Sequence, residues 1–119
     1  MAHIAFSVFM LLLLASPAAA QSTNKWGAVA YGAPDRAWGA AVDYSSPDEA
    51  RAAALESCRG RCSQTRVFYM SCAAIAENPA GGIGVEIHSW LGLAINFAMM
   101  DCRLTGPECT LTGWACARH

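Results

Sequence analysis

The chain has 119 residues, and its 8 lysines and arginines nearly balance 9 aspartates and glutamates. Because it lacks a dense basic run, the sequence excludes the clustered positive face with which proteins bind nucleic acid. Hydrophobic residues make up 55% of the chain, yet no apolar run after the first twenty residues is long enough to cross a bilayer.

The N-terminus predicts a secretory signal peptide over residues 1–20. An apolar run extends from Phe6 to Ala15, and a proline and three alanines then form a small-residue cleavage site. The run is shorter than the roughly 20 residues of a permanent anchor. We therefore expect cleavage near Ala20 and a single domain over residues 21–119 that is secreted or periplasmic.

The first half of that domain predicts the order strand, turn, strand, helix, strand. GAVAY is a short strand, GAPDR supplies turn residues, and WGAAVDY is a second strand. The segment SSPDEARAAALESC then begins a helix, with Ser46 as N-cap and Pro47 at the first helical position. Asp48 and Glu49 add the acidic residues that favour a first turn.

The segment after the helix predicts one long strand. Gly60 ends the helix, and TRVFYMSCAAIAE, residues 65–77, is rich in residues that favour strands. Its first part closes the first half and its second part opens the next. A shared strand of this kind predicts one intertwined domain.

The chain also contains an internal repeat. GAVAY matches AAIAE, AWGAAV matches GIGVEI, and ALESC matches AMMDC. The cysteines match in the same order: Cys58 with Cys102, Cys62 with Cys109, and Cys72 with Cys116. We therefore predict an α+β fold of two pseudo-symmetric ββαβ repeats, about 26–72 and about 72–116, in one compact disulfide-stapled domain.

All six cysteines follow the predicted cleavage site. An even number of cysteines in a small exported domain predicts three disulfides, each contributing about 2–4 kcal/mol to stability. Zinc is the alternative, but the sequence has no C-x2-C pair, and His88 and His119 lie outside any ligand-like spacing. We expect no metal and no cofactor.

Several of these segments together resemble a known family. They are the WGAVAY opening, AWGAAVDYSSPDEARAAALESC, the C-x9-C-A-A-I-A run and the terminal W-A-C. They resemble the exported bacterial domain-of-unknown-function family 4189, over residues 26–116. The resemblance implies a small, exported, disulfide-stapled, internally duplicated α+β domain. It carries over no catalytic residue, because no activity or ligand is established for the family.

The duplication favours some of the 15 possible disulfide connectivities. Local bridges Cys58–Cys62 and Cys102–Cys109 are the simplest symmetric choice. They leave Cys72 and Cys116, on equivalent strands, to join the two halves. The loop between residues 58 and 62 is tight, so a bridge between Cys58 and Cys102 stays open as an alternative.

The sequence offers few candidates for catalysis. Glu86 and His88 are two residues apart and would share one face of a strand, which allows a carboxylate–imidazole pair. Two polar residues on an outer strand face are the commoner case. The glycines of NPAGGIGVEI lead into a strand and not a helix, so they predict a hairpin turn and not a phosphate loop.

Three further features have mainly structural interpretations. Arg59, Arg61 and Arg66 would form a mild basic cluster, with a solvated face as the usual explanation and docking of an acidic partner as the alternative. C-R-G-R-C would be the candidate for a labile disulfide. The four tryptophans predict large core or edge side chains, or binding anchors.

The second predicted helix, in SWLGLAINFAMM, lacks the outer charges of the first. Aligned on the cysteines, Leu93 replaces Glu49 and Met100 replaces Glu56. This helix is either buried more deeply, for instance beneath the C-terminal tail, or forms an apolar patch for a homodimer or protein partner. A lipid surface is the less favoured alternative, because the stretch lacks the basic polar face of an interfacial helix. The candidate interface residues are Trp90, Leu93, Ile95 and Met100.

The function that these observations favour is non-catalytic. We predict a domain that binds or modulates another macromolecule in the periplasm or outside the cell. A cell-envelope hydrolase or a hydrolase inhibitor is the alternative, although no convergent polar cluster of an enzyme is visible in the sequence.

Overall fold

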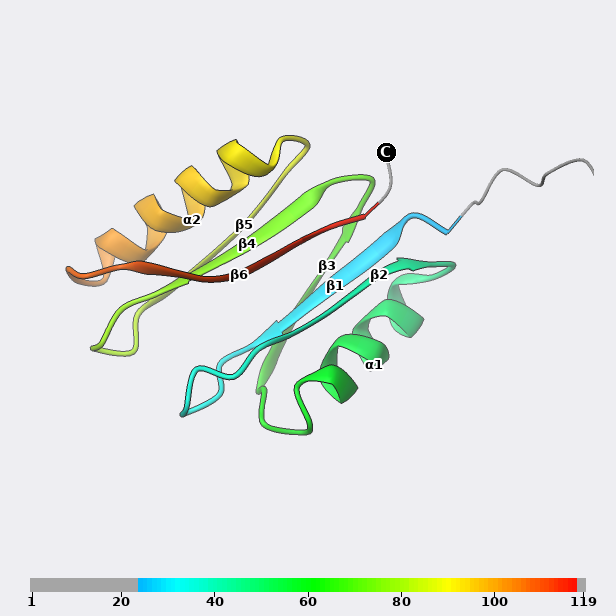
Figure 1. Ribbon diagram of the computed structural model, residues 1–119, viewed down its shortest axis with the longest axis horizontal. Helices are drawn as coiled ribbons and strands as arrows, with labels where there is room; N and C mark the ends of the chain where they lie inside the picture. Colours follow the sequence, from blue (N-terminus) through cyan, green and yellow to red (C-terminus); the bar gives the residue numbers. More distant parts are fainter. Residues whose placement is uncertain (1–23, 118–119) are drawn as a thin grey trace, which may run out of the picture.

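The computed structural model describes residues 24–117, and the predicted signal peptide lies outside this range. The chain forms two three-stranded sheets that pack face to face, with one helix on each outer face (Figure 1). None of the helices in the described range is long and apolar enough to span a membrane. In chain order the elements are β1 (Trp26–Tyr31), β2 (Gly39–Tyr44), α1 (Pro47–Ser57), β3 (Gln64–Tyr69), β4 (Cys72–Glu77), β5 (Ile83–His88), α2 (Leu91–Leu104) and β6 (Thr110–Cys116).

The two sheets have the same topology. The strand orders are β2-β1-β3 and β5-β4-β6, and all neighbouring strands are antiparallel. In each sheet the first strand of the half lies in the centre, and the helix connects the two edge strands. This arrangement confirms the predicted α+β fold of two ββαβ halves.

The segment that joins the two sheets forms two strands, β3 and β4, and not the single long strand that the sequence predicts. β3 ends at Tyr69, and Met70 has a left-handed backbone with φ 48°. Its amide donates to the carbonyl of Lys25, and the Ser71 carbonyl accepts from Ala117. The prediction of one strand over residues 65–77 is therefore wrong. Strand propensity is local, but the bend sends β4 into the second sheet, where its partners are β5 and β6.

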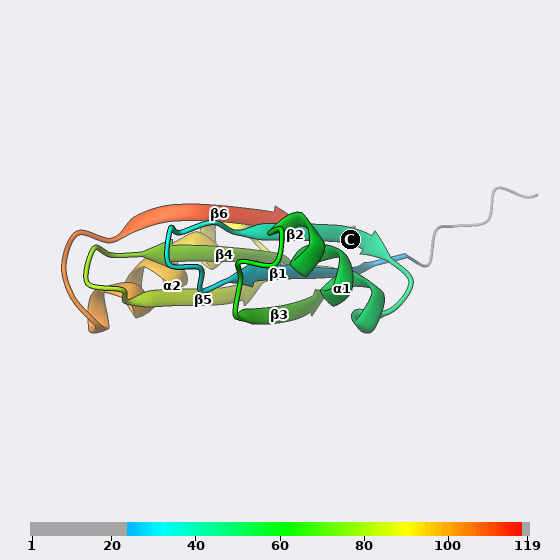
Figure 2. The same ribbon diagram turned by 90° about the horizontal axis from the view of Figure 1, so that it is seen from below.

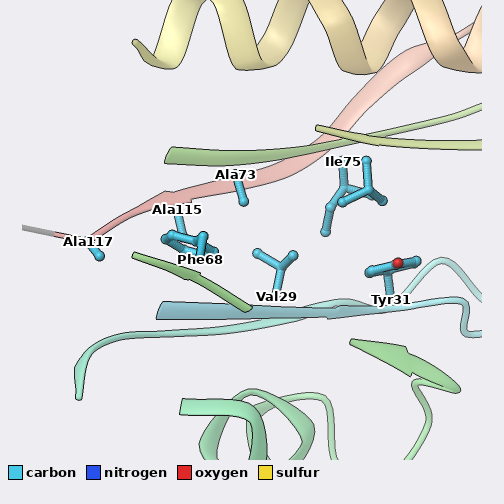
Figure 3. Packing of buried hydrophobic residues seen from close by; sticks show 8 residues of the cluster. Val29, Tyr31, Phe68, Ala73, Ile75, Ala115 and Ala117 are labelled. Carbon is cyan, nitrogen blue, oxygen red and sulfur yellow. The ribbon is translucent and has the colours of Figure 1, made fainter. Parts of the chain in front are cut away.

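The main core lies between the sheets. Val29 and Tyr31 from the first sheet face Ile75 and Ala73 from the second (Figure 3). These side chains alternate along β1 and β4 with small residues that face the helices, as the two-residue period of a strand requires. Each strand is thus buried on both faces, which explains its almost unbroken apolar sequence.

The helix–sheet layers are thin because they are built from alanine and glycine. Ala54 of α1 and Ala98 of α2 are fully buried. Gly39 on β2 and Gly84 on β5 lie beneath them: a Cβ at Gly39 would be 2.3 Å from the Ala54 carbonyl oxygen, and one at Gly84 would be 2.1 Å from that of Ala98. The two glycines occupy equivalent register positions, opposite Ala30 and Ala76. They permit the same close helix approach in both halves.

Three disulfides staple the fold: Cys58–Cys62, Cys72–Cys116 and Cys102–Cys109. The two local bridges tie the end of each helix to the segment that follows, as the repeat predicted. The third pairing also agrees with the symmetric choice, but its predicted role is wrong. Cys72 opens β4 and Cys116 ends β6, its neighbour in the same sheet, so the bridge staples the second half and does not join the two halves.

Candidate interaction surface

The outer face of α2 carries a continuous line of large apolar side chains. Its members are separated by three, four, three and four residues, and their exposed fractions range from 40% for Leu93 to 86% for Leu104. This alternation is the spacing at which helices pack side by side. We call it the α2 stripe: Trp90, Leu93, Phe97, Met100 and Leu104.

The equivalent positions of α1 do not form such a stripe. Glu49 stands where α2 has Leu93, and Glu56 where it has Met100. Glu49 also accepts a hydrogen bond from the Ser45 hydroxyl, and Asp48 forms an ion pair of 2.7 Å with Arg51. The polar outer face of α1 is that of an ordinary solvated helix, whereas α2 exposes apolar surface.

His88 fixes the beginning of the α2 stripe. Its Nδ1 accepts from the backbone amide of Trp90 over 3.1 Å, and its ring packs against Phe97 with centroids 5.9 Å apart. Trp90 is the N-cap of α2, and its side chain makes no capping hydrogen bond. His88 therefore positions two members of the stripe.

The four candidate interface residues differ in their exposure to solvent. Trp90, Leu93 and Met100 are exposed, whereas Ile95 is partly buried and packs against the core between α2 and β4. Within residues 24–117, deep burial of α2 is excluded, so that account of its composition is wrong. Phe97 and Leu104 were missed, although the three-and-four spacing from Trp90 would have identified both.

Glu86 and His88 share the outer face of β5, but they do not form a catalytic pair. Glu86 hydrogen-bonds with the side chain of Asp101 on α2, while His88 contacts Trp90 and Phe97. The hydrogen bond with Asp101 raises the pKa of Glu86, burial and the negative charge of Asp101 raise it further, and Arg66 opposes the shift. Glu86 and His88 therefore have different partners, without the hydrogen bond between them among the described residues that a catalytic pair would need.

The predicted basic cluster is dispersed. Arg61 forms an ion pair of 2.6 Å with Asp35, and Arg66 donates to the Val85 carbonyl across the two sheets. These arginines connect separate parts of the fold, because their partners lie on different loops and strands. Arg59 is exposed on the turn after α1.

The tryptophans differ in their burial, and the glycine-rich segment forms a turn. Trp38 packs over Gly113 of β6, while Trp90 and Trp114 are largely exposed and Trp26 is partly buried. The segment after β4 is the predicted hairpin, closed by hydrogen bonds between Asn78 and Gly82. It leads into β5 and forms no phosphate-binding helix start.

Comparisons with known proteins identify a family and a fold. The family model "Domain of unknown function (DUF4189)" matches residues 26–116. The chain is similar to the NMR structure of Rv1813c from Mycobacterium tuberculosis, with a TM-score of 0.58 and 24% sequence identity over 98% of this chain and 97% of that one. At this identity the likeness shows the fold alone. No curated protein matches the sequence significantly.

Proposed function

The chain belongs to the family of the domain of unknown function DUF4189. Because this family has no assigned activity, we propose a function from the surface of the domain itself. It is an exported, non-catalytic domain that binds a protein through the α2 stripe, in the periplasm or outside the cell. The observation that carries this proposal is the exposed line of apolar side chains on α2, which α1 lacks.

Export is supported by two independent features. The first twenty residues have the pattern of a cleaved signal peptide. All six cysteines are paired, and disulfides persist in oxidising compartments. A domain that works outside the cytoplasm meets its partners there, so the α2 stripe would be presented to proteins of the envelope or the surroundings.

An apolar surface such as the α2 stripe can pack against another uncharged helix face. The α2 stripe of a second copy of the chain is such a face. The spacing reads almost the same in both directions from Phe97. In an antiparallel pair, Trp90 of one copy would meet Leu104 of the other, and Leu93 would meet Met100. A two-fold contact of this kind needs only one self-complementary surface.

Site-specific crosslinking in producing cells tests the proposal. A photoreactive residue is placed at Leu93 or Met100 in the full chain, and the equivalent positions Glu49 and Glu56 on α1 serve as matched controls. We expect crosslinks from α2 only, in a product of twice the chain's mass. A product with a different protein would identify a foreign partner on the same face. Equal crosslinking from both helices, or none from α2, would refute binding through the α2 stripe.

A further inference from the structure

A cleft of about 210 Å³ lies at the end of the sandwich where two turns meet. One is the β1–β2 turn with Gly32, Ala33 and Arg36, and the other is the β4–β5 turn with Gly81. The first turn belongs to the first half and the second to the other half, and both lie at the same end of the molecule (Figure 2). The cleft therefore exists only in the assembled sandwich.

Glu77 provides a buried carboxylate to this cleft. Only 5% of the residue is exposed, and one oxygen, Oε1, accepts from the Thr112 hydroxyl over 2.9 Å. The other oxygen has no hydrogen-bond partner within residues 24–117, yet it is not sealed from solvent. No lysine, arginine or histidine of the described range forms an ion pair with Glu77.

A carboxylate in this position lacks a positive partner. Buried charges in proteins are normally paired or bound to a cation, because desolvation of an unpaired charge is costly. In the first half, Tyr31 occupies the register position of Glu77, at the end of the central strand. The fold itself does not require an acid at this position, so Glu77 is a feature of the cleft and not of the repeat.

Arg36 provides the opposite charge on the facing turn. Its backbone is left-handed, with φ 60°, and its amide closes the turn by donating to the Ala33 carbonyl. The neighbouring acid, Asp35, is already held by Arg61. Among the described residues, the Arg36 guanidinium has no ion-pair partner, and its side chain is exposed at the cleft.

We propose that this cleft binds a small ligand with a protonated primary amine and a carboxylate, as in a free amino acid or a short peptide. The ammonium group donates to Glu77, and the carboxylate is held by Arg36, whose guanidinium suits a planar anion. Ala33 and Ile83 line the cleft with apolar surface that suits the aliphatic part of the ligand. This site is independent of the α2 stripe.

Titration of the full-length oxidised protein with L-alanine and with L-alanyl-L-alanine tests the site, using backbone amide chemical shifts. We expect saturable shifts confined to residues 32–36 and 77–83 with at least one of them. N-acetyl-L-alanine lacks the ammonium group and should bind about tenfold more weakly or worse. Shifts outside these loops, no saturable shift with either probe, or equal binding of the acetylated form would overturn the proposal.

Two variants assign the roles of the charges. Glu77→Gln keeps the shape and an acceptor for Thr112, and should weaken binding of the amine about tenfold or more. Arg36→Gln should make L-alanine and its methyl ester bind equally. Arg59→Gln is the matched control, because Arg59 is also exposed with a left-handed backbone but lies outside the cleft. Unchanged binding in Glu77→Gln would refute the assignment. If that variant does not fold, the acetylated probe on the unaltered protein decides.

Discussion

α1 and α2 occupy equivalent places in the two halves, yet only their inner faces are alike. Ala54 and Ala98 are buried against glycines of the adjacent strands, whereas Glu49 and Leu93 share a position but not a chemistry. The inner face must fit the sheet closely, so few side chains are acceptable there. The outer face carries no such constraint, and a difference between the copies at that face is therefore a better guide to function than their likeness.

The largest expected difference concerns the ends of the central strands. Cys72 and Cys116 pair across β4 and β6 where Trp26 and Tyr69 pair across β1 and β3, with ring centroids 4.9 Å apart. Replacing both cysteines with alanine should lower the free energy of unfolding by about 4 kcal/mol, because the bridge closes a long loop. Tyr69→Leu should cost about 1 kcal/mol. Urea denaturation measures both, and equal losses would contradict this contrast.

The glycines beneath the helices should show that the halves are equivalent. Gly84→Ala and Gly39→Ala each place a Cβ within 2.3 Å or less of a helix carbonyl oxygen. Each should therefore lower the free energy of unfolding by about 3 kcal/mol. Gly92→Ala is the control, since nothing lies within 4 Å of a Cβ there, and it should stabilise α2 by about 0.5–1 kcal/mol. Thermal unfolding that left Gly84→Ala unchanged would show that the two helices do not approach their sheets alike.

The helix starts should respond in opposite directions. The Ser46 hydroxyl accepts from the amide of Glu49, so Ser46→Ala should destabilise α1 by about 1 kcal/mol. Trp90 provides no such bond, and Trp90→Ser should add one and stabilise the separate chain by a few tenths of a kcal/mol. The same substitution removes a member of the α2 stripe and should weaken self-association in sedimentation. Tighter association of Trp90→Ser would contradict the role of the stripe.

The smallest effect is a pH dependence confined to the second half. Hydrogen bonding with Asp101 raises the pKa of Glu86 above its usual 4.5 in the folded protein. The folded state thus holds this proton more tightly than the unfolded state. The resulting stabilisation is complete below the unfolded pKa and is lost as the pH rises through the folded pKa.

Glu86→Gln should remove this loss, because its amide stays neutral. Relative to the unaltered protein, the variant should gain about 0.5 kcal/mol between pH 4 and pH 7, a small value because the pair is partly exposed. In the first half, Ala41 stands at the register position of Glu86, so Ala41→Gln should add no comparable pH dependence. Unfolding curves at both pH values provide the measurement, and parallel pH profiles for Glu86→Gln and the unaltered protein would contradict the raised pKa of Glu86.

Much of the fold could be predicted because its signals are local. The cap formed by Ser46 and Pro47, the hairpin after Asn78 and the recurrence of the cysteines follow from short-range geometry and duplication. The break at Met70 could not be predicted in this way. A strand-forming sequence continues through the bend, and only pairing with β5 and β6 shows that the chain has changed sheets.

By itself, the sequence determined both helices, the repeat and the apolar character of α2, and it favoured the symmetric disulfide pairing. Only the tertiary structure decided that Ile95 turns to the core between α2 and β4, because the exposure of a helical residue depends on how the helix sits on its sheet. The cleft that Arg36 and Glu77 line could not be predicted from the sequence either. Its two charges lie far apart in the chain and in different halves, and they meet only when the two sheets pack.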